Sequence, residues 1–127
     1  MGRKYKYFIP PTFIYSITNT KNGKVYIGRT TNPQQRFVLH RNRMIAGTHP
    51  CELMNIDCKK YGIESFRMDV LEEVKEGSYG DAEFKYIFLN KSYDPAFGYN
   101  YKDRFCYCNG KMTSRLKKAI QSNSPTG

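Results

Sequence analysis

The feature that most constrains the fold is a pair of strand-like runs around an Asn-Gly dipeptide in residues 13–30. The runs FIYSI and KVYIG are rich in β-branched and aromatic residues, which favour strands. Asn22-Gly23 between them supplies the positive φ angles that tight hairpin turns require. The sequence therefore predicts an antiparallel hairpin that puts Tyr15 and Tyr26 on adjacent strands, and the register decides whether the two rings meet.

A helix is predicted directly after this hairpin. Asn32 is a favourable N-cap, Pro33 suits the first helical position and Gly47 is a typical stop, so the helix spans 33–46. Spacings of four and three residues place three polar side chains on one face of this helix. They are Arg36, His40 and Arg43.

The rest of the chain alternates between helical and strand-like patterns. We expect helices over 50–61 and 81–91, a strand over 65–73, a loop over 92–101 and a short amphipathic helix within 113–122. Together these elements predict an α/β (α+β) fold in which a small three-stranded antiparallel or mixed sheet is flanked by helices. The expected organisation is a basic lead-in over 1–12, one domain over 13–100, and a short basic tail over 101–127 that ends in disorder.

Charge is distributed unevenly along the chain. There are 21 Lys and Arg against 11 Asp and Glu, a net charge of +10, and residues 1–51 contain no acidic side chain. A basic segment of this kind indicates a polyanionic partner such as nucleic acid. No apolar run is long enough for a membrane span or a signal peptide, so a cytoplasmic location is expected.

The four cysteines do not follow the usual spacing of zinc ligands. Cys51 and Cys58 are separated by six residues, and Cys106 and Cys108 by one, whereas zinc pairs are separated by two to four. Reduced thiols are therefore expected. A small zinc-stabilised interaction protein, with His49 near Cys51, remains an alternative.

Five polar side chains on otherwise apolar segments are candidates for chemistry: Tyr15, Tyr26, Arg36, His40 and Glu83. A carboxylate can hold a divalent ion, a guanidinium can hold phosphate oxygens, and a phenol or imidazole can move a proton. Taken singly, each residue has an ordinary structural explanation, since a tyrosine on a strand usually packs and an arginine on a helix is usually solvated.

In combination, these residues resemble the motif set of the GIY-YIG nuclease family. The resemblance covers residues 13–100 and consists of FIY at 13–15, YIG at 26–28, Arg36, His40, Glu83 within EFKYI, and GYN at 98–100. Phe13 stands where the family has the first glycine of its motif, which alters local packing and leaves Tyr15 in place.

The resemblance implies a DNA endonuclease that hydrolyses a phosphodiester bond with one Mg²⁺ or Mn²⁺ ion per active site. Glu83 would be the only protein ligand of the metal, and Tyr15 would be the general base, with its pKa lowered by Arg36, His40 and the metal. Arg36 would clamp the scissile phosphate, Tyr26 would orient phosphate or water, and His40 would relay a proton or bond to Tyr15.

The remaining basic residues of the first half are expected to bind flanking DNA phosphates. They are Lys24, Arg29, Arg41 and Arg43, together with His49 near the site. Gly28 and Asn100 are expected to support the site without taking part in the chemistry.

Two questions of function stay open at this level. A non-catalytic nucleic-acid-binding module on the same fold would show the same charge. Members of the resembled family serve in homing, restriction, repair and phage biology, and the short tail favours a freestanding or phage-type enzyme. One site cuts one strand, so double-strand cleavage would need a homodimer, a higher oligomer or successive nicks.

Overall fold

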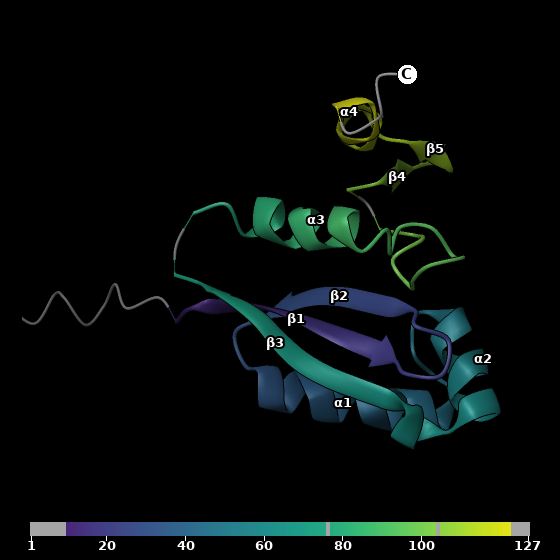
Figure 1. The fold of residues 1–127 in the computed structure, drawn as a ribbon. Coiled ribbons are helices and arrows are strands. Elements are labelled where there is room, and N and C mark those ends of the chain that lie inside the picture. Colours follow the sequence, from purple (N-terminus) through teal and green to yellow (C-terminus); the bar gives the residue numbers. More distant parts are fainter. Residues whose placement is uncertain (1–9, 76, 104, 123–127) are drawn as a thin grey trace, which may run out of the picture.

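A three-stranded antiparallel sheet forms the centre of the protein, with helices on both of its faces (Figure 1). The computed structural model describes residues 10–75, 77–103 and 105–122. The strands lie in the order β2-β1-β3 and comprise β1 (Thr12–Asn19), β2 (Val25–Thr30) and β3 (Phe66–Val74). The other elements are α1 (Pro33–Ala46), α2 (Glu52–Tyr61), a 3-10 turn η2 (Ile63–Ser65), α3 (Tyr79–Leu89), β4 (Tyr107–Cys108), β5 (Lys111–Met112) and α4 (Ser114–Ser122). The predicted α+β class with a small three-stranded sheet is confirmed.

The β1–β2 hairpin forms as the sequence predicts, although only Gly23 of the Asn22-Gly23 dipeptide has a positive φ. Gly23 has a φ of 78°, and its N–H donates to the carbonyl of Asn19 across the turn. In the resulting register Tyr15 lies opposite Gly28, and Ile17 lies opposite Tyr26. The two tyrosines are therefore diagonal neighbours on one face, with ring centroids 6.3 Å apart.

Helix α1 begins and ends where its capping residues indicate. The Asn32 side chain accepts a hydrogen bond from the N–H of Gln35, and Gly47 closes the helix with a φ of 75°. Helix α2 starts at Glu52, two residues later than predicted, because Cys51 has extended backbone angles. Helix α3 starts at Tyr79, two residues earlier, so Asp81 lies in its first turn, where a carboxylate favours the helix dipole.

Strand β3 departs from the alternation expected for it. Tyr15 pairs with Val70 and Ile14 pairs with Glu72, which leaves Leu71 as an extra residue between the two pairs. The sequence places Phe66, Met68 and Val70 on one face of this strand, but only Phe66 is buried, and Val70, on the edge strand beside the bulge, is 49% exposed.

The two faces of the sheet belong to different apolar clusters. Tyr15 and Ile17 pack toward Met44 of α1 and Met54 of α2. The opposite face carries a second cluster with members from β1, β2, α3 and the C-terminal segment: Ile14, Ile27, Ile87, Cys106 and Leu116. Figure 1 shows α1 and α3 on opposite sides of the sheet.

Residues 101–103 and 105–122 add two short strands and a helix to the fold. The β4–β5 hairpin and α4 lie on the side of α3 that faces away from the sheet (Figure 1). Leu116 is completely buried, and Arg115 pairs with Asp81 while its guanidinium stacks 4.9 Å from the ring centre of Phe84. The helix that carries Glu83 is thereby held from both sides. Disorder is expected over 122–127, but Ser122 is the last residue of α4, and the rest of that stretch lies outside the described residues, as does the lead-in up to residue 9.

We expect Leu116→Ala to lower the free energy of unfolding by about 2–5 kcal/mol, because it removes a fully buried side chain and leaves a cavity. Urea denaturation followed by circular dichroism measures the change. The matched control is Lys117→Ala on the exposed side of α4, expected to stay within about 0.5 kcal/mol of the parent. Equal stability of the two variants would show that α4 is not part of the core.

Candidate active site

The candidate site begins with the tyrosines on the α1 face of the hairpin. The hydroxyl oxygen of Tyr15 lies 2.6 Å from Nε2 of His40, which α1 brings over the sheet. The Tyr26 ring lies 5.3 Å from the same imidazole, centroid to centroid. All three side chains are held by regular secondary structure, so their relative positions follow from strand register and helix packing.

Gly28 allows Tyr15 to adopt this position. A Cβ at residue 28 would overlap the phenol oxygen and the adjacent ring carbons of Tyr15. The glycine of the YIG tripeptide is therefore required by the close approach of a cross-strand side chain, as the expectation of a supporting role for Gly28 suggests.

Behind His40 lies a second imidazole, that of His49. Nδ1 of His40 is 2.7 Å from Nε2 of His49, and Nδ1 of His49 accepts a hydrogen bond of 2.9 Å from the N–H of Cys51. The two rings lie edge to edge and nearly in one plane, with centroids 5.0 Å apart and 23° between the planes, and Asn55 bonds to both the N–H and the carbonyl of His49. The sequence assigns His49 to DNA contact, but the side chain is 6% exposed and both ring nitrogens have protein partners.

Burial determines the protonation of these groups. It lowers the pKa of His40 to about 3, with the charges of His49 and Arg36 acting in the same direction, and lowers that of His49 to about 4, with help from Arg43. Both imidazoles are therefore neutral at pH 7. Burial raises the pKa of Tyr26 to about 12.

The pKa of Tyr15 differs from the sequence-based expectation. Burial raises it well above the ordinary value, and a negative charge on Tyr26 or Glu83 would raise it further. Arg36 lowers it, as expected, but does not outweigh burial. Neutral His40 supplies no positive charge, so the expected lowering by both residues is not found in the free protein.

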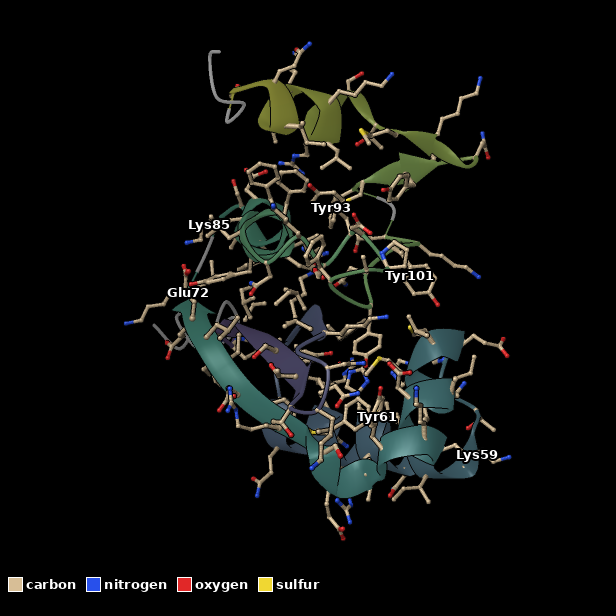
Figure 2. The ribbon with its side chains drawn as sticks, turned by 45° about the vertical axis from the view of Figure 1, so that its right-hand side comes forward. Lys59, Tyr61, Glu72, Lys85, Tyr93 and Tyr101 are labelled. Atoms are coloured by element: carbon tan, nitrogen blue, oxygen red, sulfur yellow. The ribbon has the colours of Figure 1, made fainter. Side chains whose placement is uncertain are left out.

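A cavity of about 340 Å³ opens beside the cluster. Arg36, His40 and Arg43 all line it, in keeping with their predicted position on one helix face. The loop after α3 contributes residues that sequence reasoning did not assign to the site: Tyr99, Tyr101, Lys102 and Asp103. Tyr101 reaches from this loop toward α2, where its hydroxyl oxygen accepts from the N–H of Leu53 (Figure 2).

Glu83 approaches from the other face of the sheet, on α3. Its side chain is 12% exposed, and its Oε1 lies 3.5 Å from Nε of Arg29 on β2. Its charge raises the pKa of both Tyr15 and Tyr26, so it lies close enough to act on the tyrosine cluster. Arg29 was assigned to DNA phosphates by the sequence, whereas here it pairs with the candidate metal ligand.

Asn100 anchors the closing loop to the edge strand β2. Its Oδ1 accepts from the N–H of Ile27 at 2.8 Å, and its Nδ2 donates to the carbonyl of the same residue at 2.9 Å.

Two other predicted residues, Lys24 and Arg41, lie apart from the cavity. Lys24 follows the hairpin turn. Arg41 acts on Cys58 of α2, where its charge lowers the pKa of the thiol while burial raises it. Neither is among the residues that line the cavity.

The donor set suits an ion that needs few protein ligands. Among the described residues no group of three or more His, Cys, Asp or Glu side chains could hold a metal. Glu83 offers one carboxylate, which fits Mg²⁺ because this ion keeps several waters and takes further oxygens from substrate phosphates.

The four cysteines are unpaired thiols, and Cys58 and Cys106 belong to different apolar clusters. Within the part of the chain that the structure describes, every helix is too short or too polar to cross a bilayer.

Comparison with solved structures finds two close matches to the fold. The catalytic domain of the homing endonuclease I-TevI is 27% identical with a TM-score of 0.62, covering 69% of this chain and 95% of that one. A point variant of the catalytic domain of the intron endonuclease I-TevI is 27% identical with a TM-score of 0.60, covering 72% and 93%. No curated protein matches the chain. The family model of the GIY-YIG catalytic domain matches residues 11–100, and the chain therefore belongs to the GIY-YIG family of nucleases.

Proposed function

We propose that this protein is a DNA endonuclease that hydrolyses phosphodiester bonds with one bound Mg²⁺ or Mn²⁺ ion and with Tyr15 as general base. The observation that carries the proposal is the 2.6 Å contact between the Tyr15 hydroxyl and His40 beside a cavity lined by Arg36. A phenol, an imidazole and a guanidinium in this arrangement supply a base, its partner and a phosphate clamp.

Glu83 is the residue proposed to hold the metal. When bound, the ion would stabilise charge that develops on the phosphate and on the leaving oxygen. Because Arg29 pairs with Glu83 in the free protein, a cation held by Glu83 would weaken that pair. The guanidinium of Arg29 would then be available for a DNA phosphate, which retains the phosphate-binding role expected for it.

Tyr15 has to give its proton to solvent water before it can act as a base. The positive charge of Arg36 already favours the phenolate, and added positive charge at Glu83 would cancel the opposing effect of that carboxylate. The phenolate then takes a proton from the attacking water. As the water oxygen bonds to phosphorus, the bond from phosphorus to the leaving oxygen breaks, and Arg36 holds the phosphate oxygens.

Arg43 and Lys102 line the same cavity as Arg36 and are proposed to hold phosphates that flank the cut, with Lys24 and Arg41 reaching more distant phosphates. Tyr26, on the cavity wall, is proposed to orient phosphate or water.

One active site cuts one DNA strand. The ratio of nicked to linear plasmid therefore reports whether two copies of the protein act together.

Glu83→Gln is expected to lower Mg²⁺-dependent cleavage at least about 100-fold while DNA binding is retained, because the change removes the charge that holds the ion. Nicking of supercoiled plasmid with Mg²⁺ or EDTA measures cleavage, and a gel-shift assay in EDTA measures binding. Glu73→Gln on the exposed side of β3 is the matched control and should cleave like the parent. Undiminished cleavage by Glu83→Gln would exclude the proposed metal ligand. A parent protein that binds DNA but never cleaves it would indicate the non-catalytic alternative.

Tyr15→Phe is expected to lose about 100-fold or more of the cleavage rate, since it removes only the hydroxyl that would act as base and leaves the ring on Gly28. Single-turnover cleavage at saturating protein isolates the chemical step. Tyr61→Phe on α2 is the matched control, because Tyr61 is not among the residues that line the cavity. Full activity of the Tyr15 variant would show that another group is the base.

A further inference from the structure

Three side chains form a continuous hydrogen-bonded chain that ends on a backbone amide. It runs from the Tyr15 hydroxyl to His40, from His40 to His49, and from His49 to the N–H of Cys51, with heavy-atom distances of 2.6, 2.7 and 2.9 Å. Cys51 precedes α2, and its amide can only donate a hydrogen bond. The direction of every bond in the chain follows from this fixed end.

The direction is obtained by assigning one proton at a time. A neutral imidazole carries one ring proton, and Nδ1 of His49 is an acceptor because it faces the Cys51 N–H. The proton of His49 is therefore on Nε2, where it is donated to Nδ1 of His40. His40 then carries its proton on Nε2 and donates it to the hydroxyl oxygen of Tyr15. A doubly protonated His40 would set two N–H groups against each other at the 2.7 Å contact.

We propose that His49, oriented by the Cys51 amide, is a positioning residue that fixes the tautomer of His40 so that His40 donates a hydrogen bond to the oxygen of Tyr15. This bond stabilises the phenolate, since hydrogen bonds to charged acceptors are stronger than those to neutral ones. It also means that His40 cannot take the proton of Tyr15, in contrast to the relay that the sequence suggests for this residue.

The surroundings of His49 are suited to this role. Its backbone is held by Asn55 through two hydrogen bonds, its ring lies nearly in the plane of the His40 ring, and the residue is 6% exposed. Arg36 and Arg43, which act electrostatically on the two imidazoles, disfavour a second proton on either ring. Each of these contacts preserves a neutral imidazole in a fixed orientation.

The direct test is ¹⁵N NMR of the histidine rings in the full-length protein at pH 7. The ring-nitrogen shifts distinguish protonated from unprotonated positions. We expect both His40 and His49 to carry their proton on Nε2. A His40 proton on Nδ1, or on both nitrogens, would overturn the assignment.

The Cys51 amide can be tested with a matched pair of variants. Cys51→Pro removes the N–H at a residue whose φ of −85° is near that of proline, and Cys51→Ala keeps the N–H while removing the same thiol. We expect Cys51→Ala to keep the Nε2 tautomers. Cys51→Pro should populate the reversed chain, with His40 protonated on Nδ1. Identical tautomers in the two variants would overturn the proposal.

The effect on cleavage rests on the proposed role of Tyr15, whereas the tautomer measurement does not. We expect single-turnover cleavage by Cys51→Pro to be at least about tenfold slower than by Cys51→Ala. Equal rates with different tautomers would overturn the role of His49 in the reaction and leave Tyr15 as the base. Full activity of Tyr15→Phe would instead overturn the proposed function.

If Cys51→Pro fails to fold, His49→Phe serves as the second variant, because it keeps an aromatic ring beside His40 and removes the donor to His40. We expect its His40 signal to shift toward the Nδ1 tautomer and its cleavage rate to fall at least about tenfold. A folded His49→Phe variant with the parent tautomer at His40 would contradict the proposal.

Discussion

The packing of the Tyr15 ring on the backbone of Gly28 is the contact on which the candidate site depends. Tyr15 lies on β1, the central strand, so its Cα is fixed by hydrogen bonding to strands on both sides. Gly28 allows the ring to lie flat across the neighbouring strand, and this brings the phenol oxygen to His40. A side chain at residue 28 would displace the oxygen, and with it the end of the hydrogen-bonded chain that begins at the Cys51 amide.

Local signals account for the parts of the fold and site that could be predicted from sequence. The hairpin follows from Asn22-Gly23, and the first helix follows from its N-cap and from Gly47. Helical spacing was enough to place Arg36 and His40 together, because residues four apart share a helix face whatever the tertiary structure. The bulge in β3, which turns Glu72 and Val74 toward the α3 side of the sheet, has no comparable local signal.

The features that were missed depend on long-range packing. Arg29 looks like any other basic residue in the sequence, and its pairing with Glu83 appears only when α3 crosses β2. His49 lies in the loop between α1 and α2 and bonds to His40, nine residues before it. The path of that loop determines where its ring lies. The β4–β5 hairpin did carry a signal, since Asn109-Gly110 is the same turn dipeptide as in the first hairpin, and both of its residues have positive φ.

The second core cluster joins the two ends of the described chain, since Ile14 and Leu116 belong to it together. Contacts between residues so distant in sequence form slowly, because a long loop has to close before they contribute any stability. During synthesis, the hairpin and α3 therefore emerge from the ribosome before the segment that covers the outer side of α3. Until that segment arrives, the outer side of the helix carrying Glu83 lacks its contacts with Leu116 and Arg115, so a nascent chain would fix the position of this carboxylate only at the last step of folding.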